Sequence, residues 1–329
     1  MSITTKVGTI HYDALLSNYA ADYMSQQNKF ITKELLPAVI VNKQGDKYAK
    51  FSSKGLFDVK NDLRAKGTEA EMIDTLFMSS DSYYCDERAL KEKIYLQDII
   101  NADAIVQEEK RKTFRLVNAL LLSQEYRAAS LVFTAANYSS TSKATIAAAD
   151  QWSLNDYATN DPQKQIRDYA YTICNRSGLT YSDLTVVISD ETMNGLRRSP
   201  FIQNYMASTV AKNIDANVLA GYFGVGKVLI GAASYNTAKE GQTVSVSGMW
   251  GKNALICYTQ AGATMEDPSF AKTFLWNGVG NAATQDRGIV GVRKWYDENT
   301  KTNYIESELN YDQKIVFEDV AYLLSEVIA

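Results

Sequence analysis

The strongest constraint on the fold is a long helical pattern over residues 95–138. No proline or glycine occurs between Lys91 and Lys143, so nothing in this run interrupts a helix. Side chains of mostly apolar type recur there at the spacing of one helix face. That face consists of Ile105, Val106, Thr113, Leu116, Val117, Leu120 and Gln124. The sequence therefore predicts one long amphipathic helix.

The segment before this helix has a different pattern. Between residues 42 and 82, charged and apolar residues alternate between Gly45, Gly55 and Gly67. This alternation predicts a hairpin with strands at 47–52 and 72–78 and a turn at Gly55. A long charged hairpin has little hydrophobic backing of its own, so we expect it to lie on a neighbouring molecule.

Residues 1–40 resemble an arm that carries a short helix. Leu15, Tyr19 and Tyr23 lie four residues apart and form one apolar face. Pro37 ends the helical pattern, and a strand is expected at 38–41. The small and polar run at 139–150 indicates an exposed loop.

Helices and strands alternate from Pro162 onward. Helices are expected at 163–176, ending at Gly178, and at 191–196, interrupted by Pro200. Strands are expected at 184–189, 227–230, 243–247, 255–259 and 303–309, and after a turn the segment 317–328 is a strand or short helix. Both helices and strands are therefore predicted in this part of the chain.

Composition excludes several classes of function. Hydrophobic residues make up 46% of the chain and charged residues 22%, and the net charge of −4 argues against strong electrostatic capture of nucleic acid or an anionic membrane. No run reaches the roughly 18–20 apolar residues of a membrane span, and the N-terminus has no signal-peptide core, so cytoplasmic synthesis is expected. The three cysteines, Cys85, Cys174 and Cys257, fit reduced thiols. A single histidine, His11, leaves few routes to general base catalysis.

A glycine-rich segment partly matches a phosphate-binding loop. Residues 221–227, GYFGVGK, fit the first positions of G-x-x-x-x-G-K-[ST], but Val228 stands where Ser or Thr should bind magnesium. The segment also leads into a predicted strand, whereas a phosphate-binding loop leads into a helix. We interpret it as a glycine turn before a strand, with a nucleotide site as the alternative.

Other polar clusters have a structural and a functional interpretation. Residues 108–115, EEKRKTFR, form a solvated helix face or contact DNA or an inner partner, and the structural interpretation is favoured. The pairs Glu108/Glu109, Glu266/Asp267, Asp297/Glu298 and Glu318/Asp319 are interpreted as solvated surface, because none is set with a histidine, nucleophile or metal-ligand spacing. The aromatic residues Trp250, Phe270, Phe274, Trp276, Trp295 and Tyr296 are expected to anchor the core and interfaces.

An ordered series of patterns resembles a known family. The segment FITKELLPAVIVNKQGDKYAKF places a proline before a strand, and a tryptophan-led loop with Asp161-Pro162 precedes a helix and a buried strand. The strand KVLI, the Trp250-Gly251 strand and the passage from DPSF to FLW continue the series. As a set these patterns resemble the major capsid proteins of tailed bacteriophages, which share the Hong Kong 97-type capsid fold. The resemblance implies that the chain is α+β.

The resemblance implies a division of the chain. Residues 1–37 would be an N-terminal arm, and residues 38–84 the extended hairpin loop. Residues 85–150 and 300–329 would form a peripheral domain with a long spine helix, and residues 151–299 an axial domain. Burial of the charged hairpin and the N-terminal helix would then come from other subunits.

The expected function is structural, with no catalytic, cofactor or metal site. The subunit would assemble into hexamers and pentamers of an icosahedral head enclosing double-stranded DNA, with a portal and a separate scaffolding protein as partners, non-specific DNA contact and no membrane. The alternatives are an encapsulin-type compartment, a tail-tube subunit and a phosphate-binding-loop enzyme. Candidate inter-subunit contacts are Tyr19, Tyr23, Lys47, Lys50, Lys54, Asp58, Asp62, Arg64, Lys66, Arg197 and Arg198.

Overall fold

The computed structural model describes most of the chain from residue 30 onward. The described ranges are 30–52, 79–95, 105–152, 161–207, 213–260, 264–276 and 290–328, with positions 16, 20, 63–64, 66–67, 69–70, 97 and 262 between them, and only the backbone is described over 105–108. The predicted N-terminal helix face at Leu15, Tyr19 and Tyr23, and the predicted strand at 72–78, lie outside these residues.

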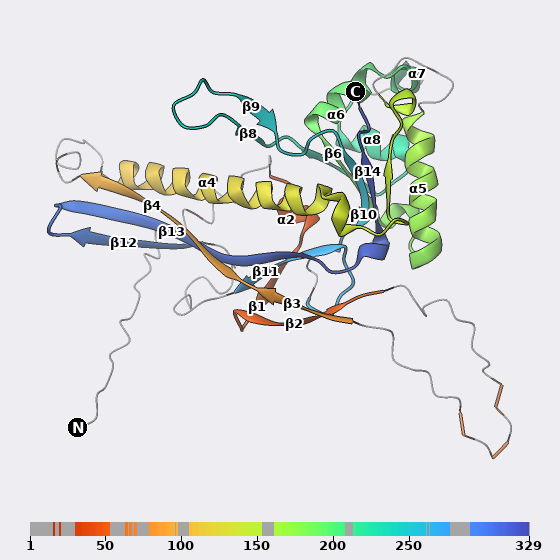
Figure 1. Ribbon diagram of the computed structural model, residues 1–329, viewed down its shortest axis with the longest axis horizontal. Helices are drawn as coiled ribbons and strands as arrows, with labels where there is room; N and C mark the ends of the chain where they lie inside the picture. Colours follow the sequence, from red (N-terminus) through yellow and green to blue (C-terminus); the bar gives the residue numbers. More distant parts are fainter. Residues whose placement is uncertain are drawn as a thin grey trace.

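Two five-stranded sheets organise the molecule (Figure 1). In the first sheet the strand order is β1-β11-β13-β12, and β4 also pairs with β13. Its strands are β1 (Ala38–Val41), β4 (Asp86–Tyr95), β11 (Ala271–Trp276), β12 (Gly291–Asp297) and β13 (Thr302–Ile315). Only the β1–β11 pair is parallel. Because β13 is 14 residues long, its C-terminal end pairs with β11 while the rest lies between β12 and β4.

The predicted long helix is α4 (Ile105–Phe133), which lies along β4 and β13 (Figure 1). Thr113, Leu116, Val117 and Leu120 are buried, as the apolar stripe predicts. The predicted start at residue 95 is wrong, because residues 86–95 form β4. All ten residues of β4 pair in antiparallel register with β13, and this pairing overrides the helical pattern of the sequence at residue 95.

The second sheet has the order β5-β14-β10-β6-β7. Its strands are β5 (Lys143–Thr145), β6 (Leu184–Ser189), β7 (Lys227–Gly231), β10 (Ala254–Tyr258) and β14 (Ala321–Ser325). Helices α5 (Pro162–Ser177), α6 (Asp190–Arg198), α7 (Pro200–Ala207) and α8 (Ala216–Phe223) surround it (Figure 1). All six residues of β6 are buried, as predicted for a strand covered on both faces.

Local signals set the helix ends in this part as expected. Asp161 caps α5 by accepting a hydrogen bond from the Gln163 N–H at 2.9 Å, and Gly178 ends the helix in the left-handed region at φ 70°. Pro200 separates two helices, but it also begins α7, where its fixed φ suits a first helical turn.

Two expectations for the chain between and after these elements are wrong. The segment 139–150 is not only a loop, because β5 pairs in parallel with β14. The predicted turn after residue 309 is absent from the described residues 302–315, where β13 continues without a break because β11 supplies a new partner beyond β12. The last segment contains a 3₁₀ turn, η4 (Glu318–Val320), and then β14.

Two small hairpins extend from the sheets. One pairs β2 (Gly45–Lys50) with β3 (Ser79–Tyr84), and the other pairs β8 (Ser234–Asn236) with β9 (Val246–Gly248). The remaining elements are α2 (Thr32–Leu35), η1 (Ala135–Asn137), η2 (Ala148–Asp150) and η3 (Tyr181–Asp183). No helix in the described ranges is both long and apolar enough to cross a membrane.

Candidate functional site

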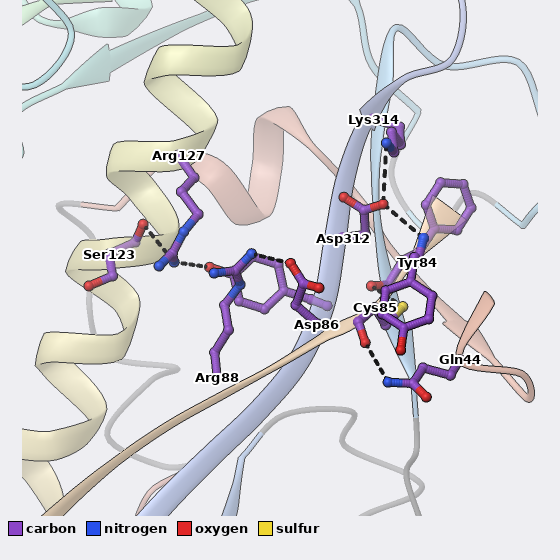
Figure 2. A network of polar contacts seen from close by, with 11 residues as sticks. Gln44, Tyr84, Cys85, Asp86, Arg88, Ser123, Arg127, Asp312 and Lys314 are labelled. Atoms are coloured by element: carbon purple, nitrogen blue, oxygen red, sulfur yellow. Dashed lines mark hydrogen bonds and ion pairs between the residues drawn. The ribbon is translucent and has the colours of Figure 1, made fainter. Parts of the chain in front are cut away.

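The root of the β2–β3 hairpin is tied to the first sheet by polar contacts (Figure 2). The Tyr84 N–H donates to Asp312 of β13 at 3.0 Å, and the Asp312 carboxylate lies 3.4 Å from the Lys314 ammonium group. Gln44 and Cys85 exchange two bonds across the base of the hairpin, at 2.8 Å and 3.2 Å. The root of the hairpin is therefore held in a fixed position on the first sheet.

Aromatic packing supports this root from the side of β11. Phe274 is fully buried, and the ring of Tyr83 stacks on it at 4.6 Å between centroids, while the Tyr48 ring lies at 5.2 Å. Burial raises the pKa of Tyr48 above its ordinary value, and it raises the pKa of the Cys85 thiol to about 12. Cys85 is therefore a protonated core residue here, as expected for a reduced structural thiol.

Two arginines join α4 and β4 to Tyr311 of β13. The Arg127 guanidinium donates to the Tyr311 hydroxyl at 2.6 Å and to the Ser123 carbonyl at 3.2 Å. Arg88 pairs with Asp86 at 2.8 Å, and its guanidinium carbon lies 5.3 Å from the centre of the Tyr311 ring. These contacts connect the long helix to the strand whose residue Asp312 holds the hairpin.

A buried carboxylate on α4 was not identified from the sequence. Glu125 is fully buried and accepts hydrogen bonds from the Ile31 N–H, the Thr32 N–H and hydroxyl, and the Trp250 indole. Burial raises its pKa above the ordinary value, and the four donated bonds oppose that rise. Glu125 thus fastens the start of α2 and the second sheet to the long helix.

Some of the candidate contact residues are described by the structure and others are not. Lys47 on β2 is exposed and Lys50 half-buried; Arg64 and Lys66 are exposed, and Arg197 and Arg198 are exposed at the end of α6. Tyr19, Tyr23, Lys54, Asp58 and Asp62 lie outside the described residues. The β2 pair and the α6 pair stand on different parts of the molecule (Figure 1), so they do not form one site within a single subunit.

The charged cluster at 108–115 faces the first sheet in part. Glu109 pairs with Lys294 of β12, Lys112 donates to the Lys93 carbonyl at 2.8 Å, and Arg115 lies 3.3 Å from Glu92. The interpretation of Glu109 as fully solvated surface is wrong, because its side chain is only 14% exposed. Intramolecular pairing therefore occupies several charges of this cluster.

Carboxylates from the other acidic pairs accept hydrogen bonds, those of Asp267 and Asp297 within local turns and that of Glu318 from a segment far away in the sequence. Asp267 accepts from the Thr264 N–H and hydroxyl, Asp297 accepts from Asn299 and Thr300, and Glu318 accepts from the Ser139 N–H. Within the described ranges, no group of three or more metal-ligating residue types stands together.

The glycine-rich segment has the geometry of a turn. Gly224 ends α8 in the left-handed region at φ 74°, and β7 begins at Lys227, so a helix precedes the segment and a strand follows it. A Cβ atom on Gly226 would lie 1.9 Å from the Ser182 carbonyl oxygen, which explains this glycine by close backbone packing. The Lys227 ammonium group pairs with Glu34. The interpretation as a turn before a strand is confirmed.

Three of the predicted aromatic anchors lie in the core. Trp250, Phe270 and Phe274 are fully buried, and Phe133 contacts Trp250 edge-on at 5.5 Å. Trp295 is half-buried and stacks on Tyr304 at 5.4 Å.

Comparison with solved structures identifies this arrangement of sheets and long helix. A phage-related protein from Bordetella bronchiseptica is similar with a TM-score of 0.76 at 20% identity, over 97% of this chain and 98% of the other. The capsid of cyanophage P-SCSP1u is similar with a TM-score of 0.57 at 11% identity, over 99% and 93%. The fold is the Hong Kong 97-type capsid fold.

Sequence comparison finds relatives with a capsid role. The chain is 28% identical over 274 residues to the major capsid protein of Pseudomonas phage JBD67, covering 82% of this chain and 84% of the relative. It is 24% identical over 323 residues to the major capsid protein of Burkholderia phage BcepMu, covering 96% of each. No protein-family model matches the chain. The similarity to the capsid fold and to phage major capsid proteins thus covers nearly the full length.

Proposed function

We propose that this chain is a major capsid protein whose copies assemble into the icosahedral head of a phage. The observation that carries the proposal is the agreement of two comparisons: the fold is a capsid fold, and both sequence relatives are major capsid proteins over most of their length. The role is structural, and the subunit is a component of the virion.

Hexamers and pentamers around double-stranded DNA are the expected assemblies. In this proposal residues 1–37 are the arm, 38–84 the extended loop, 85–150 and 300–329 the peripheral domain, and 151–299 the axial domain. Residues 300–329 supply β13 to the first sheet and β14 to the second, so this segment connects the two sheets. Assembly in the host cytoplasm, with a separate scaffolding protein and a portal, belongs to the same proposal.

The fixed root of the hairpin supports a contact role for the extended loop. Because Tyr84 and Cys85 are held to β13 and to Gln44, the root of the loop has a fixed position on each subunit. Many copies of one weak contact, repeated by symmetry, can stabilise a shell. The charged residues proposed for this contact are Lys47, Lys50, Lys54, Asp58, Asp62, Arg64 and Lys66, with Arg197 and Arg198 on α6 contacting a second neighbour.

The alternatives have less support. A phosphate-binding-loop enzyme is disfavoured because Gly226 packs on a backbone carbonyl and Lys227 pairs with Glu34. An encapsulin-type compartment would use the same fold, but the two sequence relatives are phage capsid proteins. A tail-tube subunit would assemble as rings or tubes.

Deletion of residues 53–78, joined by a short glycine-serine linker, tests the role of the loop. The deletion keeps β2 and β3, whose residues Tyr48 and Tyr83 are part of the core. We expect a folded subunit with an unchanged melting temperature that no longer closes shells. Deletion of residues 238–244 in the β8–β9 hairpin is a size-reducing control. Normal shells from the 53–78 deletion would contradict the assigned role of the extended loop.

A further inference from the structure

A cavity of about 310 Å³ lies between the long helix and the first sheet, beside the hairpin root. Its walls include Arg88 of β4, Tyr126, Arg127 and Ser130 of α4, and Tyr311 and Gln313 of β13. The cavity is large enough for a small polar group with part of its apolar stem, and Leu131 supplies an apolar wall for such a stem.

The cavity has an excess of positive charge. Arg88 and Arg127 approach the Tyr311 ring from β4 and α4 (Figure 2), with guanidinium carbons 5.3 Å and 6.0 Å from its centre. Arg88 is neutralised by Asp86, but within the described part of the chain Arg127 makes no ion pair and bonds only to a hydroxyl and a carbonyl. Asp312 also borders the cavity, and it is engaged by Lys314 and the Tyr84 N–H.

Two buried donors around the same cavity have no acceptor. The side-chain amide nitrogen of Gln313, on a residue only 9% exposed, donates to no atom among the described residues, and neither does the Arg88 Nε. Buried donors of this kind are normally satisfied. Both residues line the cavity, so a small rotation of either side chain would bring its N–H to an oxygen acceptor there.

We infer that this cavity binds a carboxylate. The inference rests on the charge excess at Arg127, on the two buried donors without an acceptor, and on the planar guanidinium donors, which match a carboxylate in a paired geometry. The carboxylate has two possible sources: a free small acid, or an Asp or Glu side chain of another copy of the chain. In the second case the inference deepens the proposed capsid function, by naming one contact between subunits.

The first arm of the test uses the unassembled subunit and succinate at constant ionic strength. Binding of a free acid raises the melting temperature of the wild-type subunit, and R127Q and Q313M each weaken that binding by about tenfold, the factor expected for loss of one charged or buried hydrogen bond. R115Q is the matched control, because Arg115 lies on the same helix, is 79% exposed and does not line the cavity. Q313M keeps the test valid if R127Q does not fold.

The second arm uses assembled R127K particles treated with a water-soluble carbodiimide, which joins an amine to a carboxylate in contact with it. A cross-linked peptide that joins residue 127 to an Asp or Glu of another copy assigns the pocket to a neighbouring subunit, and R115K is the control. Two results together overturn the inference. The first is that succinate leaves the melting temperature of the wild-type subunit unchanged. The second is that R127K gives no cross-link to another copy, which includes the case in which residue 127 is joined only to Asp86 or Asp312 of its own chain. If the wild type forms shells but neither arm detects a carboxylate, the pocket is contradicted and the proposed function stands. If the wild type forms no shell, the proposed function is contradicted and the succinate measurement still tests the pocket.

Discussion

Trp250 donates its indole N–H to the carboxylate of Glu125 across 2.9 Å, and both side chains are fully buried. The same carboxylate caps the start of α2 through Ile31 and Thr32. Trp250 precedes β10 of the second sheet, and Glu125 lies on the helix that packs on the first. One carboxylate therefore connects α2, the long helix and both sheets.

Replacing Glu125 with glutamine is expected to destabilise the unassembled subunit by about 1.5–3 kcal/mol, because an amide N–H₂ group would face donors that now meet an oxygen. Urea unfolding of the subunit measures the change. Q124A, at the neighbouring half-buried position, is the control and should cost less than about 1 kcal/mol. Equal losses in the two variants would show that Glu125 has no special role.

The variant D312A is expected to loosen the root of the hairpin without unfolding the sheet. The Tyr84 N–H would lose its acceptor, and hydrogen exchange at this amide should accelerate about fivefold for a bond of about 1 kcal/mol. Shell yield should fall with it, because the root of the extended loop would be held less firmly on the first sheet. K314A keeps the acceptor and serves as the control; unchanged exchange at Tyr84 in D312A would contradict this account.

The loop before β11 is expected to make stability depend on acid pH. Hydrogen bonds from the Thr264 N–H and hydroxyl lower the pKa of Asp267 below its ordinary value of 3.8. The folded state therefore binds this proton less tightly than the unfolded state, so the stabilisation is present above pH 3.8 and is lost as the pH falls through the folded-state pKa.

Melting temperatures between pH 5 and pH 2 should consequently fall less steeply in D267N than in wild type. E240Q, at an exposed position near the β8–β9 hairpin, should follow the wild-type curve. Parallel curves for D267N and wild type would show that the Asp267 contacts do not contribute to stability.

Features set by neighbouring residues were predictable from the sequence, and features set by distant partners were not. Asp161, Pro162 and Gly178 define both ends of α5 through local backbone chemistry, so that helix was predicted within two residues. The strand β4 was not predicted, because its partner β13 lies more than 200 residues further along the chain.

In the candidate site too, local features were predictable from the sequence and contacts with distant residues were not. The charges of the hairpin are visible in the sequence, but the contacts that fix its root come from Asp312, 228 residues beyond Tyr84. Glu125 was missed because a lone acid on a helix is usually solvated. Its position four residues after Leu121 and seven before Val132 places it on the buried face, which was the available signal.

Electron microscopy of the purified full-length protein, alone and with a cognate scaffolding protein, tests the central claim most directly. The account predicts closed icosahedral shells, or the hexamers and pentamers from which they are built. Particles that remain monomers or dimers at high protein concentration and assembling salt, or that form only open tubes, would contradict it.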